Sequence, residues 1–181
     1  MEWKKEYETP PASELLHLLL KDRRPTGHFN KVWPNIYIGD AHTAKNKAAL
    51  LSLGVSHVVN TADGPSHVET GASFYSDTNI QYHGTEATDS KDFDLSPFFH
   101  EVANFIHEGL SHQSGKVFVH CARGISRSAT LVLAYLMIWE KLTLVEAIEA
   151  IRKHRNILPN AGFLQQLCHL DARLASERRG S

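Results

Sequence analysis

Cysteines are scarce in this sequence: Cys121 and Cys168 are the only two among 181 residues. Two cysteines cannot build the disulfide framework of a small secreted domain, so that class is excluded. Thiols are kept reduced in the cytosol and the nucleus. We therefore expect a cytoplasmic protein, with the nucleus as the other compartment of this kind.

Long apolar runs and an excess of one charge are also absent. No run approaches the roughly 20 residues that span a bilayer. The apolar segment 15–20 is short and follows acidic residues, unlike the basic start of a signal peptide. Nineteen Lys and Arg against twenty Asp and Glu leave a formal charge of -1. This balance argues against nucleic acid or a membrane as the main partner, and it leaves the oligomeric state open.

The histidines do not form a metal-binding pattern. There are twelve, but none lies in an H-E-x-x-H motif or beside a cysteine cluster. The sequence therefore predicts no zinc site.

The length favours one well-buried domain. We expect three parts: a polar lead-in segment with a short amphipathic helix at 1–30, a folded domain at 31–176 and a tail at 177–181. Within the domain, short β-type runs alternate with helical patterns, which is typical of an α/β fold with a central, mostly parallel sheet flanked by helices. The expected strands are 36–38, 55–59, 80–83 and 116–120, and the expected helices are 45–53, a helix starting at Ser96–Pro97, 129–139, one opened by a capping box at 143–146, and 161–174.

The most informative stretch is His-Cys-Ala-Arg-Gly-Ile-Ser-Arg-Ser at 120–128. It joins the predicted strand 116–120 to an apolar, buried helix, and ligands in such folds bind at the carboxyl ends of strands. A tight strand-to-helix loop offers several backbone N–H groups and a helix dipole to one anion. The predicted phosphate-binding residues are Ala122, Arg123, Gly124, Ile125, Ser126 and Arg127.

Three side chains of this stretch fit phosphoryl transfer. The Arg127 guanidinium can bind two phosphate oxygens with parallel N–H groups, which lysine cannot do. The same positive field is expected to lower the pKa of Cys121, so that a thiolate is available as nucleophile. Ser128 is placed to donate a hydrogen bond to the sulfur and so to ease its departure. The leaving oxygen also needs an acid, and spacing alone leaves Asp89 and Asp92 as alternatives.

The chain resembles the protein tyrosine phosphatases, and among them the small atypical dual-specificity phosphatases of the skeletal-muscle and testis subgroup. The resemblance covers most of the chain, through the segments 32–40, 53–60, 93–96, 120–136 and 158–164. It implies the fold of that family and the hydrolysis of phosphotyrosine and phosphothreonine or phosphoserine in proteins, through a cysteinyl-phosphate intermediate. It further implies Asp89 as the acid and later the base, and neither a metal nor another cofactor.

Three other functions remain as alternatives. A phospho-residue binding module with little turnover would keep the loop but lack Cys121 or the acid. A sulfur-transfer enzyme of the rhodanese kind would not need Asp89 or Ser128. A phosphoinositide phosphatase is the nearer rival, but its loop usually carries lysines and this loop has none.

Four further residues have two interpretations each. Arg155 lies in a basic cluster at a helix end; in the related fold an arginine there can hold a second phosphate, but such residues also merely complement the helix dipole. Asn160 either supports the catalytic loop or forms an ordinary Pro-Asn turn, which we favour. His120 either tunes the thiolate or is packed, and we class it as a support residue. Cys168 is either a core residue or a redox partner, and we expect it in the core.

Overall fold

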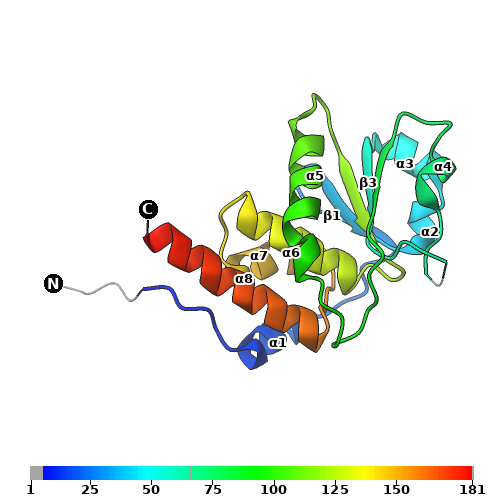
Figure 1. The fold of residues 1–181 in the computed structure, drawn as a ribbon. Coiled ribbons are helices and arrows are strands. Elements are labelled where there is room, and N and C mark those ends of the chain that lie inside the picture. The colour runs from blue at the N-terminus through cyan, green and yellow to red at the C-terminus, as the bar shows by residue number, and fades with distance from the viewer. Residues whose placement is uncertain (1–5, 66, 181) are drawn as a thin grey trace.

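The structure, a computed structural model, describes residues 6–65 and 67–180. A five-stranded sheet in the order β1-β2-β5-β3-β4 lies between two layers of helices (Figure 1). β1 is antiparallel to β2, and the other neighbouring strands are parallel. The predicted α/β fold with a mostly parallel sheet is thus confirmed. The strands are β1 (Phe29–Trp33), β2 (Ile36–Gly39), β3 (His57–Asn60), β4 (Gln81–Gly84) and β5 (Val117–His120).

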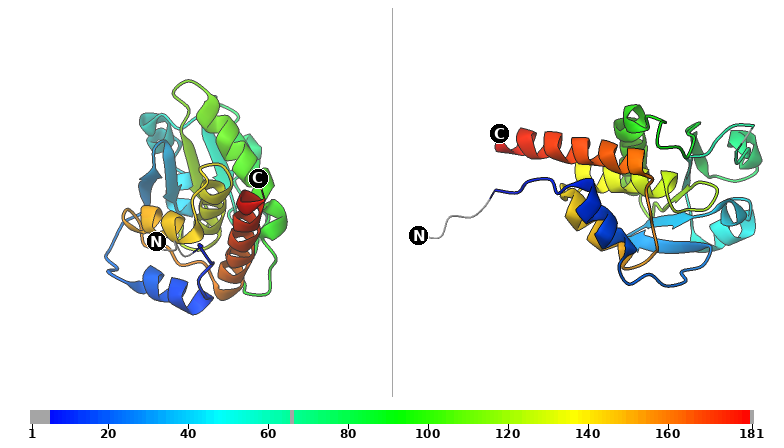
Figure 2. Two further views of the ribbon diagram at one scale, coloured as in Figure 1. Left: turned by 90° about the vertical axis from the view of Figure 1, so that its left-hand side faces the viewer. Right: turned by 90° about the horizontal axis from the view of Figure 1, so that it is seen from below.

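The two helical layers differ in size (Figure 2). The larger layer is built around α6 and covers one face of the sheet, and the smaller layer covers the opposite face. The larger layer contains α5 (Phe99–Ser111), α6 (Arg127–Ile138), α7 (Leu144–Arg152) and α8 (Ala161–Arg179), with α1 (Ala12–Leu20) against α7 and α8. The smaller layer contains α2 (Ala41–Ala44), α3 (Lys47–Leu53) and α4 (Gly71–Phe74).

The alternation of side chains along β5 explains why both faces are covered. Val117 and Val119 belong to the large core, whereas Phe118 belongs to the small one. Helix α6 then passes through the large core, and every residue from Arg127 to Met137 is buried. A helix that is apolar nearly all round is stable only in such a position, as the sequence predicted.

Several local predictions are confirmed. Gly54 ends α3 in the left-handed conformation, with φ 81°. The capping box of Thr143 and Glu146 opens α7. The short amphipathic helix of the lead-in segment is α1, whose Leu15 and Leu19 are buried. Residues 1–5 of that segment lie outside the described residues.

Apart from small shifts at the ends of elements, three features differ from the prediction. Strand β1 was not expected, because its polar Asn30 and Lys31 and the proline after it weaken the β pattern. Ser96 does not cap an α-helix: its N–H and hydroxyl both donate to Asp94 Oδ1, Ser96–Phe98 forms a 3-10 turn, and α5 starts at Phe99. Helix α8 continues to Arg179, so the expected tail is helical over most of its length.

No helix within the described ranges is long and apolar enough to cross a bilayer.

Candidate active site

The cysteine loop begins where β5 ends, at the edge of the sheet where the parallel strands β2, β3 and β4 also end. Neighbouring segments fix the loop at its start. The Thr61 hydroxyl donates to the carbonyl of His120 at 2.7 Å, and the Ala41 N–H donates to the carbonyl of Ala122 at 3.0 Å. The loop leads directly into α6, which begins at Arg127.

The Cys121 sulfur is buried among donors. The Gly124 N–H donates to Sγ at 3.1 Å, and Ser128 Oγ lies 3.2 Å from it. Burial raises the pKa of the Cys121 thiol, but the Ser128 hydroxyl, the N–H groups of Ser128 and Ile125 and the charge of Arg127 outweigh it. The pKa therefore lies below its ordinary value, which favours the thiolate.

Gly124 allows the loop to fold tightly. Its φ is +69°, and a Cβ built on it would lie 2.5 Å from the carbonyl oxygen of Gly39. Both observations exclude a larger side chain, since the first is strained for L-residues and the second is a steric clash. The sequence pointed to the backbone angle of Gly124, but the close approach to Gly39 became visible only in the fold.

Arg127 lies beside the sulfur and is only 8% exposed. One of its terminal nitrogens donates to the carbonyl of Ala87 at 2.9 Å. Its Nε is buried and has no hydrogen-bond partner among the described residues. A buried donor without an acceptor is rare in proteins and indicates a place for a ligand oxygen.

Around Cys121 and Arg127 the surface is hollowed by a depression of about 300 Å³. Ala122 and Arg123 are exposed on its rim, whereas Ser126 is buried. The residues that line it are Asp89, Cys121, Ala122, Arg123, Ile125, Ser126, Arg127, Leu158 and Asn160.

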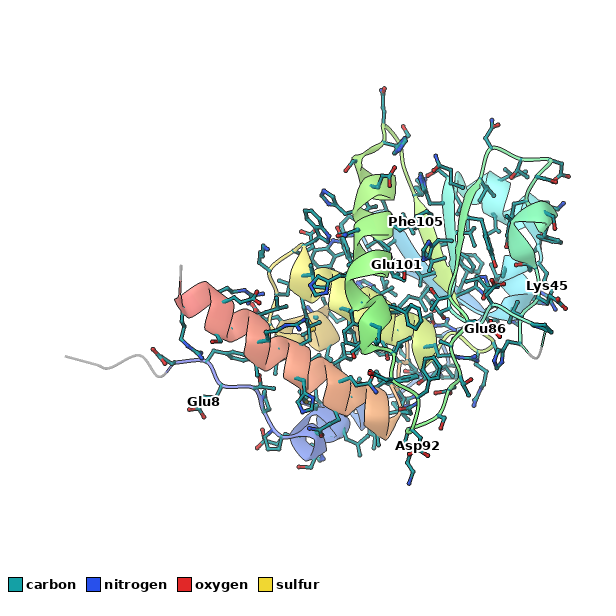
Figure 3. The ribbon with its side chains drawn as sticks, in the orientation of Figure 1. Glu8, Lys45, Glu86, Asp92, Glu101 and Phe105 are labelled. Carbon is teal, nitrogen blue, oxygen red and sulfur yellow. The ribbon has the colours of Figure 1, made fainter. Side chains whose placement is uncertain are left out.

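The fold brings Asp89 to this depression and leaves Asp92 outside it. Asp89 Oδ1 accepts hydrogen bonds from Ser126 Oγ at 2.8 Å and from Asn160 Nδ2 at 2.9 Å. Asp92 is exposed on the loop before α5 (Figure 3). Both aspartates had been candidates on spacing alone, and only Asp89 shares a cavity with Cys121.

Asn160 has both of the roles that the sequence offered as alternatives. Its Oδ1 accepts from the Phe163 N–H at 2.9 Å and so caps α8. Its backbone N–H donates to Ser126 Oγ at 3.0 Å, and its side-chain amide holds Asp89. The interpretation as a mere turn was therefore incomplete.

Arg155 does not line the depression, and its contacts favour a support role over the predicted second-phosphate site. The side chain is 3% exposed and lies under the loop. It donates to the carbonyls of Gly124 at 2.7 Å and Arg123 at 3.1 Å, and also to the Gly27 carbonyl and Asn30 Oδ1. With these acceptors, the guanidinium supports the loop from beneath.

His120 and Cys168 are both buried. His120 Nδ1 lies 3.3 Å from the carbonyl oxygen of Cys121, and burial lowers the pKa of this histidine to about 4. The ring is therefore neutral at pH 7 and makes no charge contact with the thiolate. Cys168 belongs to the large core, as predicted, and burial raises the pKa of its thiol.

Sequence reasoning missed three residues near the site: Gly39, Asn30 and Gln166. Gly39 and Asn30 contact the loop or its support, and Gln166 contacts the segment that follows Asp89. Each partner lies more than 70 residues away along the chain, so no local spacing could have revealed the pairs.

Comparison with known proteins identifies relatives of the whole domain. The family model described as "Dual specificity phosphatase, catalytic domain" matches residues 36–173. Dual specificity protein phosphatase 13B of Homo sapiens and that of Mus musculus are each 50% identical to the chain over 172 residues, covering 94% of it and 87% of the relative.

Solved structures show the same likeness. The crystal structure of human DUSP28 superposes with a TM-score of 0.71 at 25% identity, covering 84% of this chain and 97% of that one. A mouse putative dual specificity phosphatase complexed with zinc tungstate gives a TM-score of 0.72 at 25% identity, with 87% and 94% covered.

Proposed function

The chain belongs to the dual specificity phosphatase family, and from this premise we propose that the depression around Cys121 is its active site. One observation carries the proposal. A cysteine sulfur with a lowered pKa, a buried arginine Nε without a partner and an aspartate carboxyl share one cavity. They can serve as the nucleophile, the group that binds the phosphate anion, and the proton donor. The substrate is a phosphorylated protein, with phosphotyrosine and phosphothreonine or phosphoserine as the groups removed.

In the first step, the Cys121 thiolate attacks phosphorus and the bond from phosphorus to the ester oxygen breaks. Arg127 and the loop N–H groups bind the equatorial oxygens, on which negative charge is spread. Asp89 gives its proton to the leaving oxygen. Both hydrogen bonds described above reach Oδ1, and Oδ2 accepts none from the described residues, so Oδ2 can carry the proton.

In the second step, water attacks the cysteinyl phosphate. The Asp89 carboxylate takes a proton from this water, and the bond from sulfur to phosphorus breaks. The sulfur leaves as a thiolate, and the Ser128 hydroxyl 3.2 Å away stabilises that charge. Inorganic phosphate is released, and both side chains return to their starting protonation states.

We further propose that the protein works in the cytoplasm, with the nucleus as the other reducing compartment. Both of its cysteines are free thiols in the structure, and Cys121 must stay reduced to act as a nucleophile. The near-neutral charge supports a protein substrate rather than nucleic acid or a lipid surface.

The experiment is hydrolysis of p-nitrophenyl phosphate and of phosphopeptides by the wild type, Cys121→Ser and Asp89→Asn. We expect activity in the wild type and none in Cys121→Ser. Asp89→Asn should lose about 10²–10⁴-fold on phosphopeptides, as is usual for a general acid, and less on p-nitrophenyl phosphate, whose leaving group needs the proton less. A pure, folded wild type without turnover would favour the binding module. Preference for phosphoinositides over phosphopeptides would favour the lipid phosphatase.

A further inference from the structure

The first two turns of helix α8 contact the segment that carries Asp89. We name residues 87–95 the acid segment. In Figure 1 the chain between β4 and α5 descends to the start of α8. From Asp89 onward, the contacts follow one another in register with the helix, and they involve Asn160, Gly162 and Gln166.

Gln166 binds the far end of the acid segment with both ends of its amide. Its Oε1 accepts from the Leu95 N–H at 2.8 Å, and its Nε2 donates to the carbonyl of Phe93 at 3.0 Å. Leu95 is fully buried. A side chain that satisfies a backbone donor and a backbone acceptor two residues apart fixes the path of that backbone.

Gly162 allows the helix to touch the middle of the segment. A Cβ at this position would lie 2.1 Å from the carbonyl oxygen of Lys91. Any larger residue would push the segment away from α8, because the clash involves backbone and not a flexible side-chain end. The start of the segment is held separately, since Arg127 donates to the carbonyl of Ala87.

We propose that Gln166 is a positioning residue for the general acid, because it holds the acid segment against α8 so that Asp89 stays above Cys121. The inference rests on the proposed function. General acid catalysis requires the carboxyl within hydrogen-bond distance of the leaving oxygen, and small displacements are costly. Gln166 itself does not line the active-site depression. It acts through the backbone of Phe93 and Leu95.

The test uses aryl phosphates whose leaving groups differ in pKa. A poor leaving group such as phenol needs the proton of Asp89, whereas p-nitrophenolate needs it much less. We expect Gln166→Met, which keeps the length of the side chain but loses both hydrogen bonds, to lower kcat/KM about tenfold for phenyl phosphate and about twofold for p-nitrophenyl phosphate. Gly162→Ala is expected to show the same pattern by a different change.

Gln165→Met is the matched control, since Gln165 is exposed on the same helix and contacts His169 instead of the acid segment. It should leave both rates unchanged. The pH dependence of Cys121 alkylation should be unaltered in Gln166→Met, because the sulfur and its donors are untouched. This second readout and the melting temperature separate a misplaced acid from a damaged fold.

The decisive arm combines Gln166→Met with Asp89→Asn. If Gln166 acts through Asp89, the Gln166→Met change should lower kcat/KM by less than about twofold in the Asp89→Asn background. An equal loss with both substrates, or an equal loss in both backgrounds, would overturn the inference. Failure of the proposed function would look different, because the wild type would then be inactive or Asp89→Asn would be harmless.

Discussion

At the scale of single residues, the chemistry depends on how the donors around Cys121 are arranged. The hydroxyl of Ser128 and the N–H of Gly124 both reach the sulfur within 3.2 Å. Burial alone would keep the thiol protonated, so these donors and Arg127 decide its state. The loop therefore stabilises the thiolate of Cys121 in a buried position.

Removing the Ser128 hydroxyl tests this balance. In Ser128→Ala the pKa of Cys121 should rise, because a hydrogen bond to the thiolate is lost, and kcat should fall about 10- to 100-fold. The pKa is measured by the pH dependence of iodoacetamide alkylation in a Cys168→Ser background, so that a single thiol reports. Identical alkylation profiles for Ser128→Ala and its parent would contradict the account.

The residue scale is also where the sequence was most and least informative. The roles of Cys121, Arg127 and Ser128 could be proposed from one stretch, because all three lie within eight positions of each other. The choice between Asp89 and Asp92 could not be derived from spacing. The family resemblance implied Asp89, and the physical reason is seen in its contacts with Ser126 and Asn160, which join distant parts of the chain.

At the scale of elements, the loop depends on a support that comes from the end of α7. Arg155 lies three residues beyond that helix and binds the carbonyls of Arg123 and Gly124. Burial lowers the pKa of its guanidinium from the usual value, yet an arginine keeps its charge at neutral pH. A buried cation with this many acceptors orders the loop backbone, which favours a structural role over a role in substrate binding.

Arg155→Ala should therefore lower the unfolding free energy by about 3 kcal/mol, since buried carbonyls lose their donor. Urea unfolding measures the loss, and the exposed neighbour Lys153→Ala should be unchanged. Activity should fall equally on singly and doubly phosphorylated peptides. A selective loss on doubly phosphorylated peptides would instead support the second-phosphate site.

Elements with strong periodicity were predictable, and elements held by distant partners were not. The buried helix α6 and the capping box of α7 follow from local patterns. The edge strand β1 does not, because its pairing with β2 compensates for a polar, interrupted pattern. The start of α5 was missed for a similar reason, since Asp94 competes for the donors of Ser96.

At the scale of the whole molecule, the protein buries two histidines, His57 and His120. His57 and His120 are 2% and 0% exposed, and the Nε2 of each has no hydrogen-bond partner among the described residues. Burial lowers the pKa of both, that of His120 to about 4. The unfolded chain binds a proton at His120 below about pH 6.5, whereas the folded protein binds it only near pH 4, and the shift of His57 acts in the same direction.

The unfolding free energy should therefore fall as the pH drops from about 6.5 toward 4. His120 alone accounts for a decrease of about 2 kcal/mol between pH 8 and pH 5. Urea unfolding at both values measures it, and His120→Gln should show a smaller decrease than the wild type. A stability that is flat over this range, or one that rises on acidification, would contradict the prediction.

The central claim is that Cys121 itself carries the phosphoryl group during turnover. The most direct measurement is acid quenching of the wild type within milliseconds of mixing with a ³²P-labelled phosphopeptide, followed by peptide mapping. The account predicts label on the peptide that contains Cys121 in the wild type, and none in Cys121→Ser. An active wild type that never carries label on this cysteine would contradict it.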